Sequence, residues 1–477
     1  MLFNSLSFII FLILTFLLYT LFFGKEVKRR NWFLLVVSYI FYGSWNWKLL
    51  FLIVFVSAVN YFCGRAIYRS AEQRRRKSWL VVCLVVNLGV LAFFKYCNFF
   101  IGSFADLLGL FGANVSLTPL NIILPVGISF YIFQGLSYSL DIYYGRFEPD
   151  DDIVAFFAFI AFFPQLVAGP IERAKDLLPQ FHELKPFDYD RTREGVFAIA
   201  AGLFKKMVIA DRLAVYVDGV YGNPAAAAGL PSLVAVLFFT FQLYLDFSAY
   251  SQIAVGTAKL FGFDLHRNFN RPYLAVNFKD FWGRWHMTLM SWFRDYLYIP
   301  LGGNRRGKAR TMLNLFIVFL VSGLWHGASW TFVAWGALNG IFLIVFDKLL
   351  GLNPKNTLGK VFSCFLVVGL WALSLIFFRA ESFPQAMTMF SNLGFGGADS
   401  LFSFGLPKAE FFFAVLLIAG LMLIELLTKN REEQVVARFF GGSAVLRWAM
   451  YLLLVLAILY LGIYGNGSDN AFIYFQF

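Results

Sequence analysis

The sequence predicts an all-α protein that crosses a membrane many times. Of its 477 residues, 60% are hydrophobic and 14% are charged, and the mean hydropathy is +0.68. Soluble domains usually carry about 25% charged residues. Many apolar runs reach the roughly 20 residues that a helix needs to cross a bilayer, and the alternation typical of a membrane β-barrel is not evident. We therefore expect residues 1–477 to form one domain, a polytopic helical bundle of about 11 spans with re-entrant or interfacial helices.

The apolar runs alternate with short basic loops. The first run, residues 4–23, precedes a basic loop that begins at Lys25, which is typical of a retained first span with its N-terminus outside. Residues 153–168 are too short for a span and end near Pro164 and Pro170, so a re-entrant or interfacial segment is expected there. The other expected helical segments cover residues 32–45, 48–67, 79–96, 124–147, 193–210, 231–258, 312–325, 329–346, 359–378, 409–428 and 445–464.

The formal net charge of +12 has a simple explanation in a membrane protein. In a soluble chain it would suggest a nucleic-acid partner, but here the basic residues cluster in the loops, as the positive-inside rule predicts. We expect contact with membrane lipids and none with nucleic acid. The four cysteines form no CxxC pair, so neither a zinc site nor a disulfide framework is expected.

Residues 281–330 contain the candidate reaction centre. They hold two of the four histidines of the chain, His286 and His326, each directly after a tryptophan. A titratable side chain in an apolar setting is costly, so in a membrane protein it is a functional candidate. Asp246 lies in another unusually polar stretch, within the span 231–258, and should face a cavity or another helix.

Residues 281–298 have the pattern of one amphipathic helix. At about 100° per residue, Arg284, Ser291 and Asp295 share a polar face opposite a face rich in tryptophan. His286 falls on the flank of the apolar face. We expect an interfacial or half-buried helix rather than a span, with the polar face available to a substrate or cofactor.

A glycine-rich basic loop follows this helix. Gly302–Lys308 matches the first part of a P-loop, but Ala309 stands where Ser or Thr is required and no strand precedes the loop, so we reject nucleotide hydrolysis. Two interpretations remain open for Asn304, Arg305 and Lys308. They would hold the phosphates of a cofactor at a helix entrance, or they form an ordinary positive-inside loop.

The apolar helix after this loop ends in Trp325 and His326. The histidines lack metal-ligand spacing, and no nucleophile elbow occurs, so no metal site is expected. A lone histidine acting as general base suits acyl transfer from a thioester to a hydroxyl. The alternative is that His326 is a hydrogen-bonded core residue.

Several motifs together resemble the membrane-bound O-acyltransferase family, in its alginate O-acetyltransferase branch. They are WHGASW (325–330), RWHMTLMSWFRDYLYIPLGGNR (284–305) and NFNRPY (268–273), with LPVGISFYIFQGLSY, FFPQLVAGPIER, LFKKMVIAD and YLDFSAYS. The resemblance covers roughly residues 1–350 and the C-terminal tip. It implies a helical bowl with a thinned centre between two funnels, in a bacterial cytoplasmic membrane. It further implies that His326 is the catalytic residue, and that His286 is a second important histidine.

The same resemblance implies acyl transfer across the membrane. The donor would be a cytoplasmic thioester, acetyl-CoA, with no permanently bound cofactor, and the acceptor would be an exported polysaccharide or cell-wall glycan such as alginate. The partner would be an extracytoplasmic SGNH-like acetyltransferase or another polysaccharide-modifying protein. Two rival functions stay open: a transporter of an acyl donor or lipid without chemistry, and a scaffold of a secretion complex.

The end of the chain carries a further motif. Residues 472–477 read FIYFQF, and the spacing F-x-Y-x-x-F resembles the tail of the small partner peptide in teichoic acid D-alanylation, in which a tyrosine is the proposed acyl carrier. We expect residues 466–477 to form an extracytoplasmic tail in which Tyr474 carries the acyl group. The alternative is that the aromatic tail merely packs on the bundle.

Overall fold

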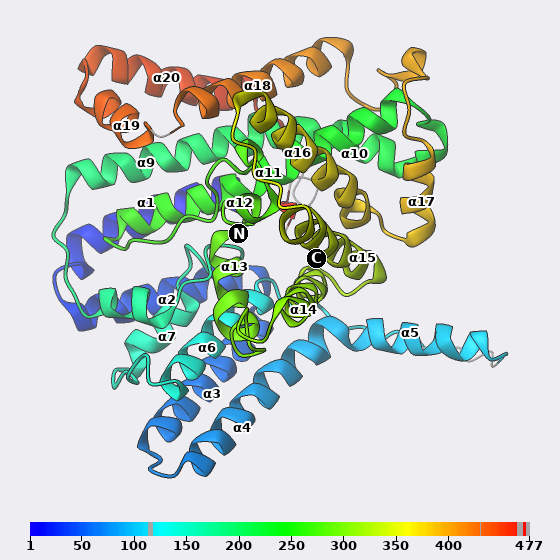
Figure 1. The fold of residues 1–477 in the computed structure, drawn as a ribbon. Coiled ribbons are helices and arrows are strands. Elements are labelled where there is room, and N and C mark those ends of the chain that lie inside the picture. The colour runs from blue at the N-terminus through cyan, green and yellow to red at the C-terminus, as the bar shows by residue number, and fades with distance from the viewer. Residues whose placement is uncertain (113–117, 430, 465–470, 474–477) are drawn as a thin grey trace.

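A computed structural model describes residues 1–112, 118–429, 431–464 and 471–473 of the chain (Figure 1). In this described part the regular structure is helical, apart from one isolated bridge between Gly229 and Leu393. The α-helices are α1 (Leu6–Leu18), α2 (Val27–Asn46), α3 (Leu50–Arg69), α4 (Gln73–Leu91), α5 (Cys97–Leu110), α6 (Ile128–Tyr143), α7 (Ile153–Ala161), α8 (Ala174–Leu177), α9 (Tyr189–Leu203), α10 (Asp211–Gly222), α11 (Leu230–Leu260), α12 (Phe278–Trp282), α13 (Met287–Phe293), α14 (Lys308–His326), α15 (Trp330–Phe342), α16 (Thr357–Arg379), α17 (Phe383–Ser391), α18 (Lys408–Leu427), α19 (Glu432–Gly441) and α20 (Ala444–Leu461). Turns of π-helix extend several of them, at Tyr19–Phe23, Ala92–Tyr96, Phe204–Ala210, Arg294–Tyr298 and Leu343–Leu349.

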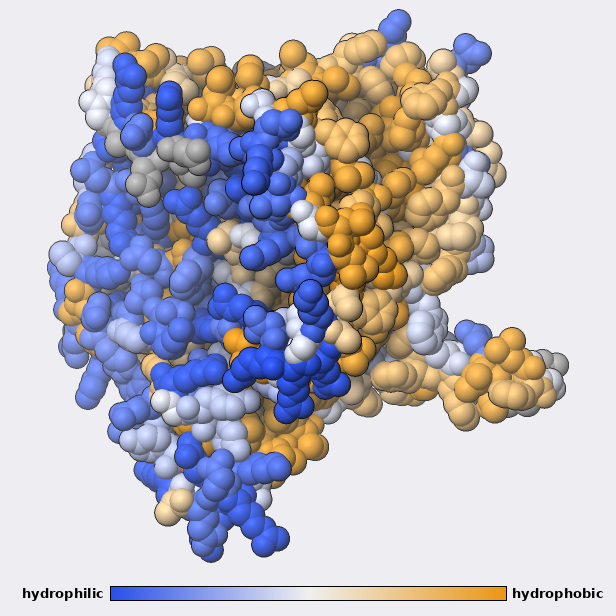
Figure 2. Space-filling view, in the orientation of Figure 1, coloured by the Kyte–Doolittle hydropathy of each residue, from blue (hydrophilic) through white to orange (hydrophobic). Residues whose placement is uncertain are grey.

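Nine helical segments among the described residues are long and apolar enough to cross a membrane. Their outer surfaces are strongly apolar, as Leu358, Val445 and Tyr460 illustrate, each about four-fifths exposed. Figure 2 shows hydrophobic residues gathered over the right-hand side of the view and along the projecting α5, next to a hydrophilic area on the left. An apolar exterior of this kind is what lipid contact requires. The prediction of a polytopic helical membrane protein is confirmed.

Helix α11 is the central element of the bundle. Its 31 residues span about 45 Å at 1.5 Å per residue. Residues up to Leu245 belong to one buried hydrophobic cluster, with α10, α15, α16 and α18, and residues from Phe247 onwards belong to a second, with α2, α3, α6 and α7. Gly256 lets α9 approach α11 closely, because a Cβ atom there would lie 2.6 Å from the carbonyl oxygen of Gly195. The helix therefore joins two halves of the interior.

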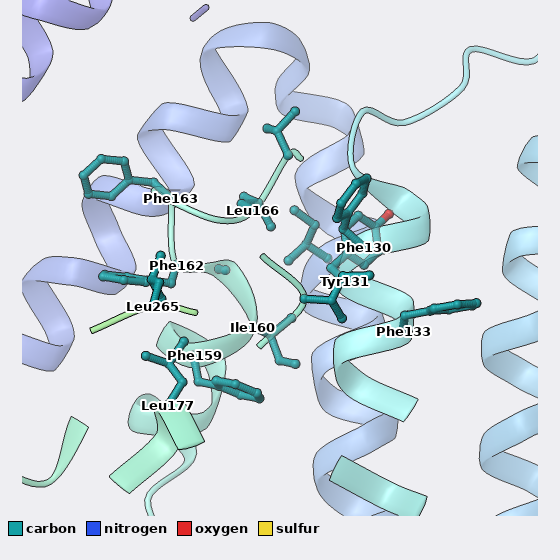
Figure 3. Close-up of a cluster of buried hydrophobic side chains, with 14 of the residues drawn as sticks. Phe130, Tyr131, Phe133, Phe159, Ile160, Phe162, Phe163, Leu166, Leu177 and Leu265 are labelled. Atoms are coloured by element: carbon teal, nitrogen blue, oxygen red, sulfur yellow. The ribbon is translucent and has the colours of Figure 1, made fainter. Parts of the chain in front are cut away.

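The expected re-entrant segment consists of a short helix and irregular backbone. Helix α7 has nine residues, and the Asp152 side chain caps its start by accepting hydrogen bonds from the backbone N–H groups of Val154 and Ala155. The chain then leaves the helix at Phe162 and stays buried through Pro170. Figure 3 shows Phe159, Ile160, Phe162 and Phe163 in a cluster of aromatic and aliphatic side chains that also includes residues of α6. Irregular backbone at membrane depth is tolerated where protein surrounds it.

Candidate active site

His326 is the last residue of α14, which forms a tight helical pair with α15. A Cβ atom on Gly323 would lie 2.3 Å from the carbonyl oxygen of Phe332, and one on Gly336 would lie 2.4 Å from that of Phe319. Only glycine fits at such backbone contacts. Gly327 ends the helix with an extended backbone, directly beside the ring of Phe332. The close packing therefore fixes the end of α14, and with it the position of His326.

Two side chains from the α4–α5 region bind the carbonyl end of α14. The Lys95 Nζ donates hydrogen bonds to the backbone oxygens of Trp325 (2.7 Å) and His326 (3.1 Å), and the Tyr96 hydroxyl donates to that of Leu324 (2.7 Å). The last carbonyls of a helix lack intrahelical partners, and a cation is favourable there. Lys95 and Tyr96 thus act as a C-terminal cap that holds the His326 backbone.

His286 lies in a sharp turn between α12 and α13. Its φ is 44°, in the left-handed region, and Arg271 is the other described non-glycine residue with a positive φ. Such a conformation costs of order 1 kcal/mol or more and persists only where the surroundings enforce it. Backbone hydrogen bonds enforce it here, from Asn270 N–H to the Arg284 oxygen (3.0 Å) and from Met287 N–H to the Asn268 oxygen (2.9 Å).

The expectation of one continuous helix over residues 281–298 is wrong. Helix α12 ends at Trp282, the chain turns through Gly283–His286, and α13 begins at Met287. The left-handed residue breaks the helical repeat, so the polar and apolar faces drawn across the whole stretch do not exist as such. His286 is not on the flank of a half-buried helix but in the interior, where it is 1% exposed.

The two histidine rings lie close together among aromatic side chains. Their centres are 6.3 Å apart, and His326 is 6% exposed. The Trp325 ring lies 5.8 Å from that of His286 and 5.0 Å from that of His326. The other ring neighbours are Phe247 (4.7 Å) and Phe130 (6.4 Å) beside His286, and Trp335 (5.0 Å) and Phe378 (5.5 Å) beside His326.

This environment keeps His286 in its neutral form. Burial lowers the pKa of His286 to about 3, so the imidazole is uncharged at neutral pH. A neutral imidazole is the form that accepts a proton in general base catalysis. Within the described ranges, no group of three His, Cys, Asp or Glu side chains is arranged to hold a metal ion. The described ring neighbours of the two imidazoles are aromatic side chains.

Ser291 and Asp295 form a separate polar cluster with Arg173. The Arg173 guanidinium lies 2.6 Å from the Asp295 carboxylate and donates to the Ser291 hydroxyl at 3.3 Å. Arg294 also binds Asp295, at 2.7 Å. Burial raises the pKa of Asp295, but the hydrogen bonds from Arg294 and Arg173 outweigh burial and leave it below the ordinary value. Sequence reasoning singled out the two α13-side residues and missed Arg173, the partner that joins them.

Of the other predicted binding residues, Trp325 contacts both histidine rings, Arg284 lies in the turn before His286, and the glycine-rich loop lies apart from the pair. Arg284 binds Asp280 at 2.7 Å and the Asn270 oxygen at 3.3 Å, and so it braces the turn that holds His286. Asn304, Arg305 and Lys308 are exposed at the opposite end of α14 from His326. The 19 residues of that helix place its ends about 27 Å apart. The glycine-rich loop is thus not part of the histidine site.

Asp246 belongs to a buried ionic cluster. Its carboxylate lies 2.6 Å from the Nζ of Lys206, which also lies 2.8 Å from the carboxylate of Asp211. It accepts a hydrogen bond from the backbone N–H of Ile473 as well, at 2.8 Å. Ala471, Phe472 and Ile473 are the described residues of the expected extracytoplasmic tail, and they lie inside the bundle, where Figure 1 shows the short red segment near its middle. Tyr474 lies outside the described residues.

A cleft of about 440 Å³ lies elsewhere on the molecule. It is found where two apolar helices end, at Tyr19–Lys25 and at Lys259–Gly262, and neither His286 nor His326 lines it. Side chains from the segment 184–192 complete its wall. They include Lys185 and Arg191, which both form ion pairs with the Asp264 carboxylate. This cleft is therefore a feature of the basic surface and not an extension of the histidine site.

Comparison with known proteins identifies the family. The sequence profile of the membrane-bound O-acyltransferase family matches residues 148–379, which include both histidines. The probable alginate O-acetylase AlgI of Pseudomonas aeruginosa is 39% identical over 383 residues, which cover 79% of this chain and 71% of the relative. The peptidoglycan O-acetyltransferase of Helicobacter pylori is 34% identical over 399 residues, 78% of this chain and 75% of the relative.

A more distant relative performs a different acyl transfer. The teichoic acid D-alanyltransferase of Bacillus subtilis is 27% identical over 248 residues, which cover 50% of this chain and 62% of the relative. The names of all three relatives describe transfer of an acyl or aminoacyl group. With the extent and identity of the match to the alginate O-acetylase, the chain belongs to the membrane-bound O-acyltransferase family and is an integral membrane O-acyltransferase.

Proposed function

We propose that this O-acyltransferase moves an acetyl group from acetyl-CoA to a hydroxyl. Acetyl-CoA enters the site from the cytoplasm, and the acetyl group serves the O-acetylation of an exported polysaccharide or cell-wall glycan. The protein would lie in a bacterial cytoplasmic membrane with both termini outside. The observation that carries the proposal is the buried pair His286 and His326, whose ring centres are 6.3 Å apart. The acetyltransferase names of the relatives from Pseudomonas aeruginosa and Helicobacter pylori support the acetyl group.

His326 is the proposed general base. It takes the proton from the acceptor hydroxyl as that oxygen attacks the thioester carbonyl carbon. The carbon–sulfur bond breaks, the CoA thiolate leaves, and His326 returns the proton to the sulfur. His286 faces the same ring cluster, and we propose that it binds the acceptor or the developing oxyanion. The backbone cap from Lys95 and the left-handed turn at His286 hold the backbone of the two histidines in place.

An assay that follows both halves of the substrate tests this function. Purified protein is given acetyl-CoA labelled in the acetyl group, and the release of free CoA thiol and the destination of the label are measured. The expected result is thiol release matched by transferred or hydrolysed acetyl, abolished in His326→Ala. His182→Ala is the matched control, because that side chain is 44% exposed, pairs with Asp150 and is not among the ring neighbours of His286 or His326 named above. Uptake of intact acetyl-CoA into vesicles without thiol release would instead support a transporter.

We also propose that Tyr474 is the first acceptor and passes the acetyl group to an SGNH-like or other polysaccharide-modifying partner outside the membrane. The supporting observation is that the preceding residue, Ile473, is hydrogen bonded to Asp246, and the neighbour of that aspartate, Phe247, packs against the His286 ring at 4.7 Å. Residues 471–473 thus lie beside the part of α11 that contacts the His286 ring.

The acetyl content of the exported polysaccharide tests the carrier role. Tyr474→Phe keeps the aromatic ring and removes the phenolic hydroxyl that would accept the acetyl group, so acetylation of the polysaccharide should be lost. Tyr464→Phe is the control, since the Tyr464 hydroxyl is exposed near the end of α20 and donates to the Ile458 oxygen. Full acetylation in Tyr474→Phe cells would rule out the carrier role while leaving acyl transfer at His326 intact.

A further inference from the structure

The ionic cluster of Lys206, Asp211 and Asp246 is buried more deeply than ordinary ion pairs. The three side chains are 2%, 5% and 2% exposed, and they carry a net charge of −1 when all three are ionised. Removing ions from water costs several kcal/mol each, and an ion pair offsets this only when further hydrogen bonds satisfy its remaining donors and acceptors. Such a cluster needs additional polar partners in the interior.

The last described residues of the chain supply these partners through their backbone. Lys206 Nζ donates to the Ala471 oxygen at 3.1 Å, and the Ile473 N–H donates to the Asp246 carboxylate at 2.8 Å. Between them, Phe472 is 1% exposed, with its ring centre 4.6 Å from the Lys206 Nζ. The same ring packs edge-on against Tyr250 at 5.1 Å. Charge, backbone and cation–π contacts therefore converge on three consecutive residues.

The approach of the chain to this cluster is also fixed. Arg212 donates to the Leu461 oxygen at 2.8 Å, and the Ile463 N–H donates to the Met207 oxygen at 2.8 Å. Both partners lie within seven residues of Lys206 in the sequence, on the same π-helical turn or the helix that follows it. The turn Phe204–Ala210 thus contacts the C-terminal region before residue 464 and again after residue 470.

We infer that Lys206 and Asp246 are positioning residues that bind the C-terminal segment 471–473 as an internal ligand and set the place at which the chain end meets the histidine site. The inference deepens the proposed function. The positioning of the chain end at the histidine site rests on that function. The binding of residues 471–473 by Lys206 and Asp246 does not depend on the proposed function. It predicts that the two carboxylates of the cluster are not equivalent, because Asp246 contacts both Lys206 and the segment, whereas within the described ranges the polar side-chain contact of Asp211 is with Lys206.

This difference provides a matched pair of variants. Asp246→Ala and Asp211→Ala each remove one carboxylate from Lys206, and each leaves Lys206 with the other. The reporter is Ile473→Cys, which keeps the backbone N–H donor, in a chain whose four native cysteines are replaced by alanine. The rate of modification by N-ethylmaleimide is measured on the purified full-length protein.

The expected result is slow modification in the parent and in Asp211→Ala. In Asp246→Ala modification should be faster by about tenfold or more, the effect of losing one hydrogen bond to a charged group. Equal rates in Asp246→Ala and the parent would overturn the inference. If Asp246→Ala does not accumulate, Ile473→Pro removes the same hydrogen bond from the other side, with Phe472→Cys as the reporter. Unchanged modification there would overturn it as well.

The acetylation readout separates this inference from the proposed function. With the segment released, the kcat of acetyl transfer to the polymer should fall, while the KM for acetyl-CoA should stay within about twofold, because the inferred role of the cluster is to position the chain end and not to bind the donor. Release of the segment with unchanged acetylation would uphold the binding of residues 471–473 and contradict the carrier role of the chain end. Loss of acetylation with the segment still protected would contradict the positioning role.

Discussion

Replacing Lys95 with methionine should weaken the site without touching either histidine ring. The substitution keeps most of the length and volume of the side chain, and it removes the two hydrogen bonds to the Trp325 and His326 oxygens. A hydrogen bond to a charged group contributes about 1.5–3 kcal/mol, and a cation at a helix C-terminus adds about 0.3–1 kcal/mol. Both bonds share one ammonium, so we expect a total loss of about 2–4 kcal/mol rather than the full sum.

The consequence for activity follows from the position of the bonded carbonyls. One of them belongs to His326 itself, so the end of α14 should fray and the base should lose its fixed geometry. We expect kcat to fall by about tenfold or more, since small misplacements of catalytic groups are costly. Tyr96→Phe is the control, because it removes one neutral hydrogen bond to the adjacent Leu324 oxygen. CoA release and thermal unfolding in detergent are measured for both variants. Equal behaviour of Lys95→Met and Tyr96→Phe would refute the capping role.

Two further predictions concern packing and pH. Gly323→Ala should destabilise the protein by about 1–3 kcal/mol, because the new Cβ would lie 2.3 Å from the Phe332 oxygen. Gly369→Ala, where the new Cβ would meet nothing within 4 Å, should instead stabilise α16 by about 0.5–1 kcal/mol. Similar unfolding temperatures for the two variants would contradict this prediction. The hydrogen bond that the His266 ring donates to the Glu172 carboxylate raises the pKa of His266 above its ordinary value of 6.5, so the pair should stabilise the fold below about pH 6 and lose this effect as the pH rises through the raised value. The free energy of unfolding of the parent and that of His266→Gln should differ by less than about 1 kcal/mol, because the His266 side chain is 59% exposed. A difference that grows as the pH rises would contradict this stabilisation.

Sequence reasoning predicted most of the helices because their signals are local. The span expected at residues 231–258 is α11, Leu230–Leu260, and the short apolar segment from residue 153 became a nine-residue helix followed by buried irregular backbone. Hydrophobic length and proline positions carry this information directly. Asp246 was expected to face a cavity or another helix, and it faces the helical region that contains Lys206.

The same reasoning failed where distant residues control the backbone. The break at His286 depends on hydrogen bonds to Asn268 and Asn270, which a helical wheel over residues 281–298 does not include. The partnership of Asp246 with Lys206 joins positions 40 residues apart, and the binding of Ile473 joins positions 227 apart. The signal for Lys206 was present, as a charged residue at the end of a mostly apolar helix, but its partners could not be chosen from the sequence.

The rate of CoA release by single histidine variants tests the central claim most directly. Purified parent, His326→Ala, His286→Ala and His182→Ala proteins are compared with saturating acetyl-CoA. The buried pair predicts that His326→Ala loses about 10²-fold to 10⁴-fold in rate, the usual contribution of a general base, that His286→Ala is also strongly impaired, and that His182→Ala matches the parent. A folded His326→Ala protein that releases CoA at the rate of the parent would contradict acyl transfer at this site.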